Sequence, residues 1–385
     1  MKTNLQPLKI SPNGRFLTCQ DGSPFFWLGD TAWELFHRLS LKETRFYFQN
    51  RIDKGFTIIQ AVILAELDGL TTPNAAGHLP LKDLDPCQPN EAYFKHVDEV
   101  VAMAAEMGLY LALLPTWGDK YNKKWGTGPE VFTPENARTY GEFLAKRFAK
   151  YPHLVWVMGG DRAPEDKEDQ QIIEQMALGI STFDKTSLIT YHPGGGTIAS
   201  DLFPNASWLQ IDMFQSRHQK QFREYRFVNK ARSRKPIRPV INGEPGYENI
   251  PNLLNKWHFQ RLNAADVRLS AYWSMLSGAA GYTYGCNEVW QMHTEKSNPL
   301  FGAQMSWDKA LDLPGATQVG FLPKLFVKLP WQEMLVSTKV FAGLKWPLHP
   351  QKLALTTVDQ GCILIYQPRG SKIKTRINKT ILNKA

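Results

Sequence analysis

Short apolar segments recur along the chain, and each of them ends in a polar or aromatic cluster. The first ends at Gly29-Asp30, the fourth at Gly159-Gly160-Asp161 and the seventh at Glu244. Within each segment the apolar residues follow one another without strict alternation, which is typical of strands buried on both faces. Eight such segments predict eight strands, at 25–28, 57–64, 109–114, 154–158, 188–191, 208–213, 239–242 and 279–284.

Helical patterns lie between most of these segments. In 91–108 the apolar residues follow helical spacing, and Gly108 stands where a helix would end. In 135–150, Tyr140, Leu144 and Phe148 are four residues apart. The sequence Ser40-Leu41-Lys42-Glu43 has the form of a capping box that opens another helix.

The predicted strand ends recur about every 36 residues, slightly more than the roughly 30 residues that one βα unit needs. Eight such units predict an α/β fold, a (β/α)8 TIM barrel. The rival is an open, doubly wound sheet. No Gly-rich phosphate loop follows any predicted strand, and eight regular units favour closure.

The two ends of the chain differ from this repeat. Residues 8–24 predict a short N-terminal β-hairpin, because Pro12-Asn13-Gly14 and Asp21-Gly22 are turn signals. Beyond about residue 335, segments 353–358, 362–367 and 372–378 predict three strands, too few for an independent sandwich. We therefore predict a catalytic barrel domain over 1–335 and a partial β domain over 336–385. The second piece either packs on the barrel or is truncated.

The net charge of +9 does not predict a nucleic-acid partner, because the basic residues are concentrated. The stretches 217–238 and 369–385 hold 15 of the 45 Lys and Arg and one of the 36 acids, so the remainder is mildly acidic. A basic segment on a helix face is usually solvated, and no nucleic-acid motif is present. We expect no membrane span, because no run of about 18 apolar residues occurs. The N-terminus lacks the apolar stretch of a signal peptide. The compartment and the oligomeric state stay open.

Aromatic residues make up 12% of the chain, with 12 Trp, 13 Tyr and 21 Phe. Sugars present flat C–H faces that stack on aromatic rings, so this composition raises a carbohydrate site as a hypothesis. A large aromatic core is the alternative explanation. The four cysteines lie far apart without a CxxC pair, which argues against a zinc cluster or a disulfide scaffold.

In a barrel of this type, the loops after the strands build the active site. The chemistry of these loops is carboxylate and aromatic, with a few histidines and amides. The strand ends nominate Asp30, Trp33, Glu66, Asp68, Trp117, Asp119, Asp161, Arg162, His192, Gln215, His218, Glu244, Tyr284 and Trp290. No HExxH motif, no GxSxG motif and no dense His/Asp cluster occurs, so we expect neither a metal nor another cofactor.

Paired carboxylates remain as the candidate chemistry. Glycoside hydrolysis needs one carboxylic acid to protonate the leaving oxygen and one carboxylate to attack or to activate water. Asp161 follows two glycines after the fourth strand, and Glu244 follows the seventh, which faces the fourth across the barrel mouth. The alternative is a structural carboxylate paired with arginine. Arg162, next to Asp161, would lower the pKa of an acid catalyst, so either Arg162 points elsewhere or Asp161 is only a substrate clamp.

Several of these motifs resemble one known family. They are Phe26–Glu34, Gln60–Gly69, Leu114–Asp119, Gly159–Arg162, Thr190–Pro193, Gly243–Pro245 and Ala279–Gly285. Over about residues 8–330 the chain is similar to the apiosidase-like catalytic domain, also termed DUF4038 and glycoside hydrolase family 140. The resemblance implies a (β/α)8 barrel that removes apiosyl units from pectin side chains. It places the acid/base on Asp161 and the nucleophile on Glu244.

The resemblance also implies a C-terminal β-sandwich, termed collagen-binding, of which this chain holds about half. Many relatives are exported. The resulting hypothesis is a retaining, exo-acting glycosidase whose partner is an oligosaccharide or polysaccharide. Its sugar-binding residues would be Asp30, Trp33, Glu66, Trp117, Asp119, His192, Gln215, Tyr284 and Trp290. The alternatives are a barrel that binds a glycan without cleaving it, and a metal-dependent hydrolase that a chelator would inactivate.

Overall fold

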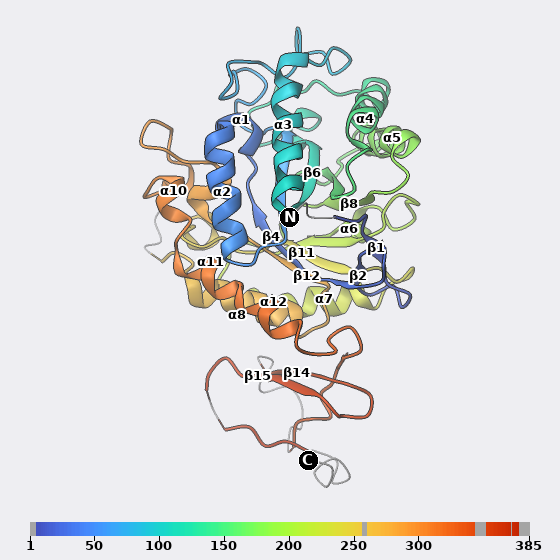
Figure 1. The fold of residues 1–385 in the computed structure, drawn as a ribbon, viewed down its shortest axis with the longest axis vertical. Helices are drawn as coiled ribbons and strands as arrows, with labels where there is room; N and C mark the ends of the chain where they lie inside the picture. Colours follow the sequence, from blue (N-terminus) through green and yellow to red (C-terminus); the bar gives the residue numbers. More distant parts are fainter. Residues whose placement is uncertain (1–4, 256–259, 343–351, 371, 377–385) are drawn as a thin grey trace.

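The computed structural model describes residues 5–255, 260–342, 352–370 and 372–376, and its centre is a barrel of parallel strands (Figure 1). The barrel strands are β4 (Trp27–Thr31), β5 (Ile58–Leu64), β6 (Tyr110–Thr116), β7 (Leu154–Gly159), β8 (Leu188–His192), β10 (Asp212–Gln215), β11 (Val240–Glu244) and β12 (Gly281–Tyr284). Because β12 pairs in parallel with β4, the first and last strands are neighbours. This arrangement confirms the predicted (β/α)8 barrel.

The ring closes between β8 and β10 through individual hydrogen bonds. The backbone N–H of Gln210 donates to Ile189 O at 3.0 Å, and Thr190 Oγ1 donates to Ile211 O at 2.8 Å. The sixth strand begins at Asp212, four residues later than the apolar run at 208–213 predicts. Along the same side, β10 also pairs antiparallel with the short β9 (Thr197–Ile198), and on its other side it pairs in parallel with β11.

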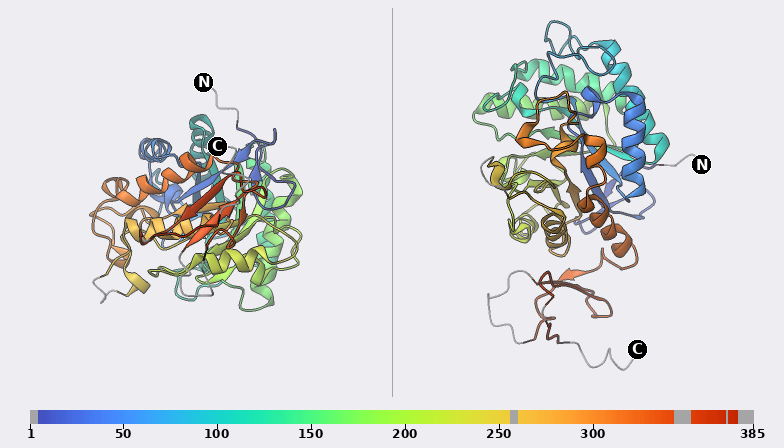
Figure 2. Two further views of the ribbon diagram at one scale, coloured as in Figure 1. Left: turned by 90° about the horizontal axis from the view of Figure 1, so that it is seen from below. Right: turned by 90° about the vertical axis from the view of Figure 1, so that its left-hand side faces the viewer.

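Helices surround the strands on the outside (Figure 2). They are α1 (Leu35–Arg38), α2 (Leu41–Asp53), α3 (Glu91–Met107), α4 (Pro134–Phe148), α5 (Lys167–Phe183), α6 (Ala199–Leu202), α7 (Glu224–Arg232) and α8 (Ala264–Met275). The predicted capping box is confirmed, since Ser40 and Glu43 bond reciprocally at the start of α2. Gly108 ends α3 with φ +85°, a conformation that glycine adopts readily.

Shorter helices follow α8 along the chain. They are α9 (Asn287–Trp290), α10 (Trp307–Ala310), α11 (Pro314–Val319) and α12 (Phe321–Phe326). The 3-10 turns are η1 (Gly118–Lys120), η2 (Asn252–Leu254) and η3 (Leu300–Gly302).

A buried ion pair fastens α2 to the outside of the barrel. Arg51 Nε donates to Asp30 Oδ2 at 2.6 Å, and the Tyr47 hydroxyl donates to the same oxygen at 2.6 Å. The side chains of Asp30 and Arg51 are fully buried. Removing one partner of such a pair leaves the other charge buried and uncompensated.

We expect Arg51→Met to lower the free energy of unfolding by about 3–5 kcal/mol, because it leaves the Asp30 carboxyl buried without its cation. Urea unfolding measures this change. Arg45→Met on the same helix is the matched control, since the Arg45–Glu106 pair is exposed and is expected to contribute at most about 1 kcal/mol. Equal losses in the two variants would contradict the expectation.

Both ends of the chain form small antiparallel sheets. The predicted hairpin at 8–24 gains a third strand and comprises β1 (Lys9–Ile10), β2 (Leu17–Thr18) and β3 (Pro24–Phe25). The C-terminal sheet comprises β13 (Leu335–Val336), β14 (Leu353–Thr356) and β15 (Ile363–Tyr366). In place of the third predicted strand, residues 372–376 form a single bridge from Thr375 to Phe341, and 377–378 lie outside the described residues.

The C-terminal sheet packs beneath the barrel (Figures 1 and 2). Tyr366 of β15 stacks on Tyr272 of α8, with ring centroids 4.7 Å apart, and Leu355 joins the main hydrophobic core. The strands therefore lie against the barrel, as one of the two alternatives predicts. The division into two domains stays a prediction.

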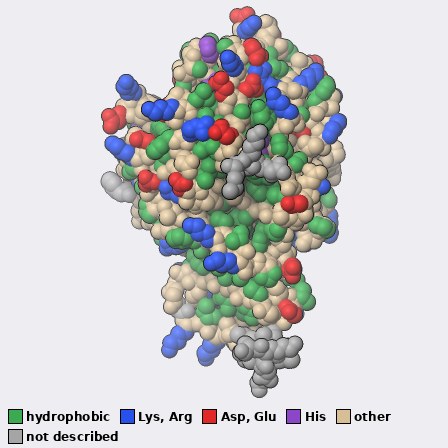
Figure 3. Space-filling view, viewed as in Figure 1, with side chains coloured by type: hydrophobic (Ala, Val, Ile, Leu, Met, Phe, Trp, Pro, Cys, Tyr) green, Lys and Arg blue, Asp and Glu red, His purple; other side chains and the backbone are tan. Residues whose placement is uncertain are grey.

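The face of the molecule in Figure 3 carries basic and acidic side chains interspersed with apolar ones.

Among the helices that the structure describes, none has the length and apolar character to cross a bilayer. The expectation that no nucleic acid binds stays a prediction.

Candidate active site

Two glycines at the end of β7 bring Asp161 to the barrel mouth. Gly159 and Gly160 have φ +84° and +131°, and a Cβ on Gly159 would lie 2.4 Å from the Tyr191 ring. Asp161 itself has φ +54°, a left-handed conformation that non-glycine residues adopt mostly at strained or functional positions. Its backbone N–H donates to His192 Nδ1 at 3.3 Å. The chain thus leaves the strand at Asp161, and its local conformation directs the Asp161 side chain into the barrel mouth.

Glu244 ends β11 and is held from two sides by histidines. His192 Nε2 lies 2.9 Å from Glu244 Oε2, and His218 Nε2 lies 3.3 Å from Oε1. The residue before it must be small, because a Cβ on Gly243 would lie 2.4 Å from Met213 Sδ. Glu244 is only 5% exposed, so its orientation is fixed by packing and by these two imidazoles.

Asp161 and Glu244 line the same cavity, whose volume is about 830 Å³. The predicted site residues that also line it are Trp33, Glu66, Trp117, Asp119, Gln215 and Trp290. The structure therefore brings eight of the eleven predicted catalytic and sugar-binding residues to one concave surface. This is the arrangement that groups acting on one bound molecule require.

The two carboxyls are shifted in opposite directions. Burial and the nearby negative charge of Glu244 raise the pKa of Asp161 to about 6. Burial alone would raise the pKa of Glu244 too, but hydrogen bonds and charge from His192 and His218 outweigh it and hold this pKa well below its ordinary value. Near neutral pH the pair combines a permanently ionised Glu244 with an Asp161 that can carry a proton.

Arg162 does not neutralise Asp161 by pairing with its carboxylate. The Arg162 guanidinium donates to the backbone carbonyls of Asn122 at 2.8 Å, Asp161 at 2.9 Å and Lys123 at 3.1 Å. It lowers the pKa of Asp161, but less than burial and Glu244 raise it. The alternative of a structural Asp161–Arg162 ion pair is therefore not supported by this geometry.

Tryptophans form the deep wall of the cavity. The rings of Trp33 and Trp117 lie 5.0 Å apart, and each lies within 5.6 Å of the His192 ring. Trp33 Nε1 donates to the Tyr247 hydroxyl at 3.0 Å, so its polar edge is satisfied. The wall presents apolar rings beside the carboxylates, a combination suited to a sugar ring with its hydroxyls.

Polar groups around this wall have unused hydrogen-bonding capacity. Asp119 Oδ2 accepts from the N–H groups of Thr127 and Gly128, while its Oδ1 and Gln215 Oε1 are buried acceptors without a partner among the described residues. Burial, followed by the charges of Glu34 and the cavity acids, raises the pKa of Glu66 well above its ordinary value.

Three predicted sugar-binding residues do not line the cavity, which corrects those predictions. Asp30 and Tyr284 are register partners on β4 and β12, and both side chains point outward to the helix layer. Asp30 meets Arg51 there, and the Tyr284 hydroxyl donates to Glu248 at 2.6 Å. His192 lies behind Glu244, fully buried against the tryptophan wall, so it supports the carboxylate instead of contacting the cavity.

The cavity also includes residues outside the eleven predicted catalytic and sugar-binding residues. Among them are Trp125, Arg217, His218 and Tyr247. His218 is one of the strand-end candidates, but the sequence alone does not predict its contact with Glu244. Trp125 lies in a loop well beyond β6, where the pattern of apolar segments gives no signal. Over the described ranges, no three His, Cys, Asp or Glu side chains group into a metal-binding set.

A family model for the apiosidase-like catalytic domain matches residues 11–333. The chain belongs to the apiosidase-like family. This confirms the resemblance of the sequence motifs over nearly the range expected from them. The match ends before β13, so the relation of the C-terminal strands of this apiosidase-like protein to a collagen-binding domain stays a prediction.

Solved structures agree with this assignment. A glycoside hydrolase family 5 protein from Bacteroides vulgatus is 29% identical with a TM-score of 0.87, over 96% of this chain and 82% of that chain. Another, described as a glycoside hydrolase, is 30% identical with a TM-score of 0.82, over 92% and 82%. An endo-1,4-beta-D-mannanase from Thermotoga petrophila is 14% identical with a TM-score of 0.56, over 78% and 100%, and shows the fold alone. No curated protein matches the apiosidase-like chain. Together the family and these neighbours support a glycosidase.

Proposed function

We propose that this protein is a retaining, exo-acting glycosidase that removes apiosyl or related terminal sugars from pectin side chains. The observation that carries the proposal is the pair of carboxyls in one cavity, Asp161 and Glu244, with opposite pKa shifts. The family supports the class of reaction. The sugar and the exo mode come from the family resemblance.

In the first step, a Glu244 oxygen forms a bond to the anomeric carbon while the bond from that carbon to the glycosidic oxygen breaks. Asp161 gives its proton to the departing oxygen. In the second step, Asp161 takes a proton from water, whose oxygen attacks the anomeric carbon and releases Glu244. His192 and His218 keep Glu244 ionised and oriented for attack. Each carboxyl thus ends the cycle in the state in which it began.

The remaining cavity groups suit sugar recognition. Unpaired acceptors on Asp119 and Gln215 would receive sugar hydroxyls and regain hydrogen bonds lost on burial. Glu66 is a further cavity carboxyl that can bond a hydroxyl. Trp33, Trp117 and Trp290 supply the apolar walls.

The test is to digest defined pectin side-chain fragments and to identify the released product. Release of a single terminal monosaccharide, apiose or a related sugar, is expected. Release of larger fragments would contradict the exo mode. Binding without release would favour a glycan-binding barrel, and activity lost to a chelator would favour a metal-dependent hydrolase.

The pH dependence of kcat/KM should have its alkaline limb near pH 6. Asp161 must be protonated to act as the acid, so activity falls as the pH rises through its pKa of about 6. Glu244 must be ionised, and its lowered pKa places the acidic limb below its ordinary value of 4.5. Initial rates from pH 3 to 9 measure both limbs. A flat profile between pH 5 and 8 would contradict the assignment of Asp161.

A further inference from the structure

Trp125 is a solvent-exposed aromatic residue at the edge of the cavity. Its side chain is among those that line the cavity, yet the residue is 70% exposed, whereas Trp33, Trp117 and Trp290 are at most 5% exposed. An exposed tryptophan beside a binding cavity presents apolar area to water, which a bound ring would cover.

One side of the Trp125 indole rests on a buried cation. The Arg162 guanidinium carbon lies 4.2 Å from the ring centroid, and Arg162 is itself 1% exposed and tied to three backbone carbonyls. Lys124 Nζ is farther from the ring, at 5.6 Å, and pairs with Glu165 at 2.7 Å. The indole is therefore supported on one face, and its exposed area belongs to the remainder of the ring system.

The loop that carries Trp125 is held by Asp119, which lines the cavity, and by the neighbouring Lys120. Thr127 N and Gly128 N donate to Asp119 Oδ2 at 3.1 and 2.9 Å, and Lys120 Nζ donates to Gly128 O at 2.9 Å. A Cβ on Gly126 would lie 2.3 Å from Asp119 Cβ, so the loop packs closely on that residue. A ring fixed in this way loses little freedom when a ligand stacks on it.

The position of Trp125 indicates which part of a substrate it meets. Its support, Arg162, follows Asp161 directly and bonds to the Asp161 carbonyl at 2.9 Å. Asp161 is the group assigned to protonate the departing oxygen, so the leaving group departs on its side of the cavity. We propose that Trp125 is a specificity-determining platform on which the leaving-group sugar stacks. This rests on the proposed function, because it uses the role of Asp161.

The test compares the wild-type protein with Trp125→Ala on two substrates. One is a pectin side-chain fragment, and the other is the methyl glycoside of the released sugar, whose leaving group has no ring to stack. We expect kcat/KM to fall about tenfold or more for the fragment and to stay unchanged for the methyl glycoside. Trp125→Phe should recover much of the loss, because it keeps an aromatic ring.

Two outcomes would overturn the platform. Equal losses on both substrates would mean that Trp125 acts through Arg162 on the position of Asp161. No loss on the fragment would mean that no ring stacks there. Phe321→Ala is the matched control, since Phe321 on α12 is 51% exposed and is not among the residues lining the cavity, and it should leave both rates unchanged.

Binding of the same fragment separates this inference from the proposed function. In the Glu244→Gln background, Trp125→Ala should weaken binding about tenfold, as measured by calorimetry. If the wild-type protein released no sugar but binding still depended on Trp125, the proposed hydrolysis would fail. Trp125 would then remain a stacking platform for a bound sugar, without a role toward a leaving group. The platform would fail if sugar were released but Trp125→Ala left the binding affinity for the fragment unchanged. It would also fail if the fragment did not bind at all.

Discussion

Glu244→Gln is expected to lower kcat by at least about 10⁴-fold while the fold is kept, because the amide cannot form the bond to the anomeric carbon. The change is nearly isosteric, so the cavity shape is preserved. Release of sugar from pectin fragments measures the loss. The Asp161 pKa should also fall below about 6, since the Glu244 charge that helps to raise it is removed. Carboxyl titration by NMR detects this second effect.

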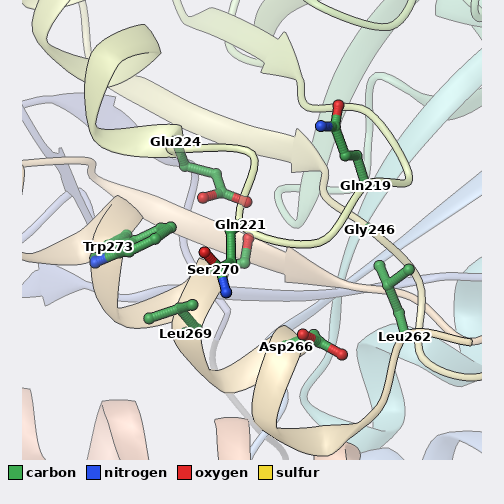
Figure 4. A pocket seen from close by; sticks show the side chains of 9 residues that line it. All are labelled: Gln219, Gln221, Glu224, Gly246, Leu262, Asp266, Leu269, Ser270 and Trp273. Atoms are coloured by element: carbon green, nitrogen blue, oxygen red, sulfur yellow. The ribbon is translucent and has the colours of Figure 1, made fainter. Parts of the chain in front are cut away.

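Glu224→Gln is the matched control for this variant. Glu224 is equally buried, at 3% exposed, but lies at a small separate cavity with Ser270 and Trp273 (Figure 4). Glu224 is not among the residues that line the active-site cavity, so activity should be unchanged. Near-normal turnover in Glu244→Gln, with folding intact, would remove Glu244 from the mechanism.

Asp161→Asn is expected to lower kcat/KM on pectin fragments by about 10²–10⁴-fold, because the amide gives no proton to the departing oxygen. The first step should be affected much less with an aryl glycoside whose leaving group needs no proton. The alkaline limb near pH 6 should disappear with that substrate. Comparing the two substrates across pH measures both effects.

Asp166→Asn is the control for Asp161→Asn. Asp166 caps α5 by accepting from Asp169 N at 2.9 Å, and asparagine caps helices as well as aspartate does. This variant should keep full activity. An Asp161→Asn protein with equal losses on both substrates and an unchanged alkaline limb would argue that Asp161 only positions the substrate.

The sequence predicts the barrel and the acids for a clear physical reason. Strands buried on both faces leave continuous apolar runs, and each run stops where the chain reaches the mouth, so Asp161 and Glu244 stand out by position. The predicted hairpin and helices follow from equally local signals, such as the capping box at Ser40.

The sequence could not predict which way individual side chains point, because this depends on contacts with residues far away in the chain. A side chain at a strand end points inward or outward, and Asp30 and Tyr284 prove to point outward to Arg51 and Glu248. The orientation of Arg162 depends on carbonyls about 40 residues away. Trp125 carries no periodic signal, because its loop is shaped by Asp119 and not by its own pattern.

The central claim is that Glu244 bonds to the anomeric carbon while Asp161 first protonates the departing oxygen and then activates water. Trapping the covalent intermediate tests this claim most directly. In Asp161→Asn, an activated aryl glycoside of the released sugar should form the glycosyl-enzyme and hydrolyse it slowly, because water is no longer activated. Mass spectrometry of the quenched, digested protein should find one sugar residue added to the peptide containing Glu244. An adduct on another carboxyl, or turnover of the aryl glycoside with no adduct at any time, would contradict the account.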